Sequence, residues 1–144
     1  MAIRKLEKAH RECLNFKVYS SQVQLFFELS FGAIYDSLDY RLMAMKYFLK
    51  AKNTTEKFYQ NDPDTALVYS YLGRLMISLR EYDWAFRCFF KSKIVREDSI
   101  GGDTLDTATI YNNLGVCCYN IQSYYPALGY FQLSYEIYKK NLGY

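Results

Sequence analysis

The sequence predicts an all-α protein built as an α-solenoid, in which antiparallel helix pairs stack one after another. Apolar residues recur at spacings of three and four along most of the chain, as they do on one face of a helix. No segment shows the alternation of apolar and polar residues that is typical of a strand between hairpin turns. Residues between positions 64 and 143 also repeat at an offset of 42, which is a period typical of stacked helical arrays.

The helical pattern predicts seven helices in order along the chain. Their expected ranges are 1–17, 22–37, 40–59, 64–79, 83–98, 104–120 and 124–141. In the first of these, Ala2, Leu6 and Ala9 recur on one face. Ser20 or Ser21 is expected to cap the second helix, because a serine hydroxyl accepts a hydrogen bond from a free N–H of the first turn.

Turn residues predict the breaks between helices. The run Asn-Asp-Pro at 61–63 predicts a helix start, because proline suits the first turn. The glycine pair at 101–102 marks the next break. Pro126 is expected at the third helical position after an N-cap at Ser123, where its missing N–H costs no intrahelical bond.

The internal repeat extends beyond its two clearest copies. Ten residues recur identically 42 positions later: Asp64, Thr65, Ala66, Tyr69, Leu72, Gly73, Tyr82, Ala85, Phe89 and Ser92. The set of a small residue, an aromatic or leucine four later and a small residue three later also occurs at 44–51 and 2–9. A glycine stands twelve residues before three of the lead alanines, at Gly32, Gly73 and Gly115.

These residues resemble the tetratricopeptide repeat family, whose motif has a Leu-Gly pair on helix A and a small–aromatic–small set on helix B. The resemblance implies a single solenoid over 1–144 with about three and a half repeats. A half repeat is expected over 1–20, and whole repeats over 21–61, 62–103 and 104–144. The period is longer than the usual 34 residues and is similar to that of kinesin light chains, mainly over 62–143.

The resemblance implies close packing inside each repeat. The glycine and the first alanine let helices A and B approach, and the aromatic is expected to fill the space against the next repeat. The first repeat departs from the pattern, because Phe31 replaces leucine and Tyr40 stands one residue off the position of Tyr82 and Tyr124. Because of this departure, the repeat pattern does not define the exact ends of the second and third helices, although it still predicts the fold.

The resemblance also implies a protein-binding groove lined by helix A of each repeat. The residues expected in it are Tyr71, Arg74, Ser78, Asn112, Asn113, Val116 and Asn120. Asn113 matches the asparagine that often holds the backbone of a bound peptide in this family. An amide suits that role, because it donates and accepts hydrogen bonds at once. The alternative is a solvated inner face.

The last helix predicts a second surface. The pattern starts and ends on a helix B, so Leu133, Ile137 and Tyr138 lack a following repeat to cover them. A terminal repeat normally has a polar outer face. We therefore expect these three residues to form an exposed end interface, and the chain to be a piece of a longer array or a member of a larger assembly.

Composition argues against most site chemistries. The net charge of +3, from 18 basic and 15 acidic residues, is too balanced to predict nucleic-acid binding. Four cysteines without C-x-x-C spacing and a single histidine, His10, make a metal site or other cofactor unexpected, and reduced thiols suit the cytoplasm. No signal peptide is readable near the start, and no apolar run approaches the roughly 18 residues that span a bilayer.

The sequence therefore favours a non-enzymatic scaffold or adaptor that binds other proteins within a larger cytoplasmic complex. A cytoskeletal or ciliary setting follows by analogy with kinesin light chains. No catalytic residues are expected, because no nucleophile and base can be assembled around one histidine. The alternatives are a reversible peptide-binding module that uses the groove and a structural subunit of an RNA-binding complex, which would show steep salt dependence. Neither a small-molecule substrate nor membrane insertion is expected.

Overall fold

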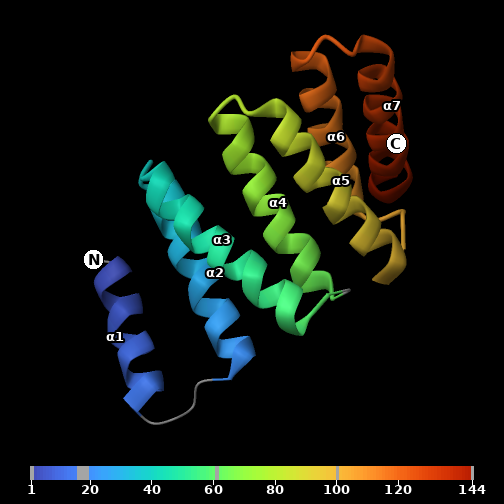
Figure 1. The fold of residues 1–144 in the computed structure, drawn as a ribbon. Helices are drawn as coiled ribbons and strands as arrows, with labels where there is room; N and C mark the ends of the chain where they lie inside the picture. The colour runs from blue at the N-terminus through green and yellow to red at the C-terminus, as the bar shows by residue number, and fades with distance from the viewer. Residues whose placement is uncertain (1, 16–19, 61, 100, 144) are drawn as a thin grey trace. The chain divides into compact units, whose positions relative to one another are not determined.

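The computed structural model describes residues 2–15, 20–60, 62–99 and 101–143, and every regular element in these ranges is a helix (Figure 1). The elements are α1 (Ala2–Asn15), α2 (Ser21–Ser37), α3 (Arg41–Phe58), α4 (Pro63–Ser78), α5 (Tyr82–Ser99), α6 (Leu105–Asn120) and α7 (Tyr124–Leu142). The all-α class and the order of the helices are as predicted. The expected end of the first helix, at residue 17, lies outside the described residues.

Local capping explains several of the helix starts. Ser20 is the N-cap of α2, and its hydroxyl accepts a hydrogen bond of 3.3 Å from the N–H of Val23. The Asp62 carboxylate accepts from the N–H of Asp64 at 2.9 Å, with proline at the first position of α4. Pro126 is the third residue of α7, so it lies where a helix needs no N–H donor.

The chain divides into two compact units, Met1–Gln60 and Asn61–Tyr144. In the first unit, α2 and α3 form a closely packed pair. The helix α1 packs on α2 much more sparsely, and none of its residues is buried. The core of this unit therefore lies between α2 and α3, and it contains Leu25, Phe27, Phe31, Ala44, Phe48 and Ala51.

In the second unit, α4 pairs with α5, and α6 pairs with α7. The helix α6 also packs against α5, and α4 touches α6, so the two pairs form one continuous core. Fully buried members of that core include Val68, Leu75, Met76, Phe89, Val95, Leu114 and Cys117. This unit thus contains two helix pairs that can be compared position by position.

A glycine on helix A makes room for the phenylalanine of helix B in each repeat. A methyl group added at Gly73 would lie 2.6 Å from the nearest ring atom of Phe89, and one at Gly115 would lie 2.7 Å from Phe131. We expected the aromatic to fill space against the next repeat. The ring in fact lies against the glycine of its own repeat, because only a helix without a side chain at that point leaves room for it.

A buried serine ties helix B to helix A in both pairs of the second unit. The Ser92 hydroxyl donates to the carbonyl oxygen of Ala66 at 2.7 Å, and Ser134 donates to Ala108 at the same distance. Both serines are almost fully buried. The last small residue of the motif is therefore a hydrogen-bonding contact as well as a point of close packing.

The turn between helix A and helix B has the same geometry in all three repeats. Its middle residue is left-handed, with φ of 63° at Asp39, 62° at Arg80 and 64° at Gln122. The N–H after each of them bonds back to the last turn of helix A, as in a Schellman motif. Tyr40 precedes α3 because the turn places each helix start three residues before the lead alanine.

Candidate functional site

An apolar stripe along α7 is exposed to solvent. Tyr124, Leu128, Tyr135 and Leu142 are each more than half exposed, and Phe131 between them is partly exposed. Their spacings of four, three, four and seven residues place them on one side of the helix. We call these five residues the α7 face. Tyrosine and leucine at this density are typical of a surface that packs against another protein.

The corresponding face of α5, 42 residues earlier, is covered within the second unit. The Phe86 ring lies 6.2 Å from the ring of Tyr130 on α7, and Phe89, which packs against Gly73 of its own repeat, is fully buried. Arg96 forms an ion pair of 3.2 Å with Asp106 of α6. The equivalent side of α5 is therefore packed against neighbouring helices of the second unit, whereas the α7 face is exposed.

The three residues predicted for an exposed end interface lie in different surroundings. Leu133 is 48% exposed but lies nine residues from Tyr124, which is half a turn around the helix from the α7 face. Ile137 is only 7% exposed, so its predicted exposure is wrong: it lies three residues after buried Ser134, on the side of α7 that packs on α6. Tyr138 is partly buried, and its hydroxyl hydrogen-bonds that of Thr109 at 2.9 Å.

The groove residues predicted on α4 share one accessible side of that helix. Arg74 and Ser78 are exposed, and Tyr71 is partly exposed. The Arg74 guanidinium carbon lies 4.8 Å from the centre of the Tyr71 ring, in a cation–π contact. The Ser78 hydroxyl donates to the carbonyl of Leu75 at 2.6 Å, so its hydrogen is already used in a bond within α4.

The groove residues predicted on α6 are accessible as well. Asn112 and Asn120 are exposed, while Asn113 and Val116 are partly exposed. The Asn120 amide donates to the Val116 carbonyl at 2.8 Å and is thus engaged within its helix. Within the described ranges the Asn113 side chain has no hydrogen-bond partner, so its amide is available to a ligand.

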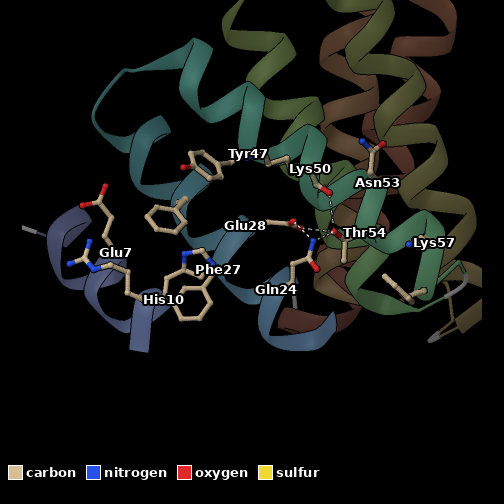
Figure 2. A pocket seen from close by; sticks show the side chains of 13 residues that line it. Glu7, His10, Gln24, Phe27, Glu28, Tyr47, Lys50, Asn53, Thr54 and Lys57 are labelled. Atoms are coloured by element: carbon tan, nitrogen blue, oxygen red, sulfur yellow. Dashed lines mark hydrogen bonds between the residues drawn. The ribbon is translucent and has the colours of Figure 1, made fainter. Parts of the chain in front are cut away.

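The first unit holds a pocket of about 810 Å³ between α1, α2 and α3 (Figure 2). Glu28 on α2 lies at its wall and is 8% exposed. One carboxylate oxygen accepts a hydrogen bond from the Gln24 amide at 2.8 Å, and the other accepts from the Thr54 hydroxyl at 2.7 Å. Phe27, Phe31 and Tyr47 supply aromatic surface to the same pocket.

This polar cluster of Gln24, Glu28 and Thr54 is absent from the sequence-based predictions. The signal was present in the repeat alignment, since Glu28 lies four residues before Gly32, where the other two repeats have tyrosine. A charged residue at a position that is buried in the other two repeats is unusual, and this difference could have predicted a polar site here.

Two titratable groups of the second unit, Cys117 and Tyr111, are buried and have raised pKa values. Burial raises the pKa of the Cys117 thiol to about 12, which keeps it protonated at neutral pH. Burial and the hydrogen bond to Glu97 raise the pKa of Tyr111 to about 12. In the ranges that the structure describes, no three His, Cys, Asp or Glu residues cluster as metal ligands would.

The charge of α5 and the apolar character of the helices bear on whether the chain binds nucleic acid or a membrane. Of the basic residues on the B helices, Lys93 pairs with Glu97 at 3.5 Å and Arg96 pairs with Asp106, which reduces the positive field of α5. No helix in the described part of the chain combines the length and the apolar character that crossing a bilayer requires.

The repeated glycine–phenylalanine and serine–carbonyl contacts define a helical-repeat protein. The model of the tetratricopeptide repeat family matches residues 64–140, which is more than half of the chain. The chain therefore belongs to the tetratricopeptide repeat family, as the sequence predicted. Repeats of this family generally mediate protein–protein interaction.

The crystal structure of BtubC (BKLC) from P. vanneervenii is similar to this chain, with a TM-score of 0.74 and 18% sequence identity. The similarity covers 96% of this chain and 55% of BtubC, so the chain spans about half the length of that protein. At this identity the similarity supports the fold, an α-solenoid of helix pairs. None of the curated proteins compared with the chain matches it.

Proposed function

We propose that the protein is a non-enzymatic scaffold or adaptor that binds another protein through the α7 face. The observation that carries this proposal is the contrast between two equivalent helices. Tyr82, Phe86 and Lys93 of α5 are partly buried, whereas Tyr124, Leu128 and Tyr135 of α7 are each more than half exposed. Burying an apolar side chain of this size stabilises an interface by about 1.5–3 kcal/mol. The stripe therefore has enough apolar surface for a specific contact.

The occupant that fits the α7 face is an amphipathic helix. In the second unit α6 packs against α5, which is the helix equivalent to α7 in the preceding repeat. The α7 face has leucine and tyrosine at the positions of Phe86 and Lys93. A partner helix should therefore be apolar along most of its contact with α7.

A peptide of residues 104–121, the sequence of α6 with its caps, is a suitable probe for this face. We expect saturable binding to the full chain, measured by fluorescence anisotropy of the labelled peptide. Leu128→Lys and Tyr135→Lys should each weaken binding at least about tenfold, because each places a charge in the apolar contact. Tyr125→Lys is the matched control, since Tyr125 is 91% exposed and lies outside the α7 face. Equal losses in all three variants, or no binding at all, would refute the proposal.

The groove between α4 and α6 is a second candidate surface, for a peptide bound reversibly. The available amide of Asn113 and the Arg74–Tyr71 pair favour it. If a partner binds there, Asn113→Ala and Arg74→Ala should weaken the complex while Leu128→Lys leaves it unchanged. The opposite pattern would favour the α7 face.

The cellular setting belongs to the same proposal. Cys88, Cys117 and Cys118 are buried cysteines that form no disulfide within the described residues, which suits a reducing cytoplasm. The similarity of the long repeats to those of kinesin light chains suggests a cytoskeletal or ciliary complex. Localisation of a fluorescently tagged full chain in cells would test this, and a secreted protein would contradict it.

A further inference from the structure

We propose that the pocket of the first unit binds the cationic side chain of a protein segment, an arginine or lysine flanked by acidic residues. The inference rests on the proposed function, because the segment belongs to a protein partner. It adds a second, chemically defined contact that lies in the first unit and uses none of the residues of the α7 face.

The first step is the state of Glu28. Its carboxylate is more than nine-tenths buried, and each oxygen accepts one hydrogen bond from a neutral donor. A carboxylate can accept about four hydrogen bonds. No ion pair involves Glu28 in the part of the chain that is described. A buried carboxylate is stabilised most by a cation, so the pocket lacks a positive group at this point.

The second step is that the repeat fold does not require a carboxylate at the position of Glu28. At the positions equivalent to Glu28 the other repeats have Tyr69 and Tyr111, both buried. At the positions equivalent to Thr54 they have Val95 and Ile137. The phenol of Tyr111 reaches α5 and donates to Glu97 at 2.8 Å. The first repeat instead has a carboxylate held between α2 and α3 beside an open volume.

The third step is the aromatic surface that lines the same pocket as Glu28 (Figure 2). The rings of Phe31 and Tyr47 stack with centroids 5.0 Å apart, and the His10 ring lies 4.9 Å from that of Phe27. The ammonium nitrogen of Lys50 already lies 5.2 Å from the centre of the Tyr47 ring. Aromatic rings attract ammonium and guanidinium groups, so this lining suits a cation better than an anion.

The fourth step concerns the charges at the mouth of the pocket. Arg11, Lys50 and Lys57 line it together with Glu7, and the three basic residues are exposed. An isolated cation would be repelled by this set on its way in. A segment with acidic residues on both sides of its arginine would satisfy the outer basic groups and the inner carboxylate together. The ligand that fits these charges is therefore a protein segment with a central arginine or lysine and acidic residues on both sides.

The capped tripeptide acetyl-Asp-Arg-Glu-amide is the probe for the test, with a peptide that has neutral citrulline in place of arginine as its matched partner. Titrated into the isotope-labelled full chain, the arginine peptide should shift the backbone NMR signals of Phe27, Tyr47 and Thr54 in a saturable manner. The citrulline peptide should bind at least about tenfold more weakly, because it lacks the charge that Glu28 requires.

Variants of the protein make the test specific. Glu28→Gln should raise the Kd of the arginine peptide at least about tenfold, whereas Glu12→Gln, an exposed change on α1 outside the pocket, should leave it unchanged. Tyr47→Leu should weaken binding severalfold, because it removes aromatic surface from the lining of the pocket. If circular dichroism shows that Glu28→Gln does not fold, Tyr47→Leu and the citrulline comparison decide.

Equal binding of the two peptides, or an unchanged Kd in Glu28→Gln, would overturn the inference. Free arginine amide that binds as tightly as the tripeptide would overturn a flanked protein segment as the source of the cation. The peptide of residues 104–121 serves as an internal reference. If it binds the α7 face while the tripeptide fails, this inference falls and the proposed function stands.

Discussion

Replacing Gly73 by alanine should destabilise the second unit, although alanine is the better helix former. The added methyl carbon would lie 2.6, 2.7 and 2.8 Å from three atoms of the Phe89 ring, where ordinary contacts begin at 3.4 Å. The ring is fully buried and cannot swing into solvent. Overpacking of this kind costs about 1–3 kcal/mol, and these contacts favour the upper end of that range.

The gain in helix propensity offsets part of this cost. An alanine in place of glycine in a helix interior stabilises it by about 1 kcal/mol. Gly129→Ala isolates that term, because nothing lies within 4 Å of the methyl group it would add to α7. We therefore expect Gly129→Ala to gain about 1 kcal/mol and Gly73→Ala to lose about 1–2 kcal/mol in the free energy of unfolding.

Gly115→Ala should fall between these two variants. Its methyl group would lie 2.7 Å from the ring of Phe131, but that ring is partly exposed and can turn outward. Urea denaturation followed by circular dichroism measures all three variants. Phe89→Leu added to Gly73→Ala should cost less than the sum of the single changes, because it removes the clashing ring atoms. A Gly73→Ala protein as stable as Gly129→Ala would refute this explanation of the repeat.

Four further substitutions test three other features of the fold. Arg80→Gly and Gln122→Gly should each stabilise the protein by about 1 kcal/mol, because both residues have a φ near +60° that costs a side-chain-bearing residue energy; no gain in urea midpoint would contradict this. Ser92→Ala should lose about 1 kcal/mol, because it removes the hydrogen bonds of this hydroxyl to the Ala66 carbonyl and to the Ser70 hydroxyl; an unchanged midpoint would show that these bonds add no stability to the contact between α4 and α5. The pKa of Tyr111 is raised to about 12, above the value of about 10 in an unfolded chain, so its contribution to stability is fully present below pH 10 and is lost as the pH rises toward 12. Tyr111→Phe should therefore flatten the alkaline loss of stability in urea titrations between pH 9 and 12, and an identical pH profile would contradict the assignment.

Most of the fold could be predicted from the sequence, because the repeat fixes several levels of structure at once. Alanine and glycine at constant spacing marked the closely packed sides of the helices, and Asp62 and Ser20 marked two helix starts. The A-to-B turns carry no such signal. Asp39, Arg80 and Gln122 share a left-handed conformation but no residue type, so it is evident only from the backbone.

The candidate sites were harder to predict, because exposure depends on helix rotation to within one residue. Leu133 and Ile137 are both apolar residues of the last helix, yet one is exposed and the other is buried against α6. The stripe that includes Leu128 and Tyr135 becomes distinct only when α7 is compared with the covered face of α5. The pocket around Glu28 depends on the sparse packing of α1 on α2, which the repeat pattern does not show, although Glu28 itself stands where the other repeats have tyrosine.

The constant turn inside each helix pair has a consequence for protein engineering. Twelve residues separate the glycine from the lead alanine in every repeat, whereas the one-residue difference between periods falls after helix B. Gly101 and Gly102 lie in that connection, and nothing would be within 4 Å of a methyl group on either one. A fluorescent label, an affinity tag or an extra domain could be inserted there, whereas one additional residue beside Arg80 would move Phe89 away from Gly73.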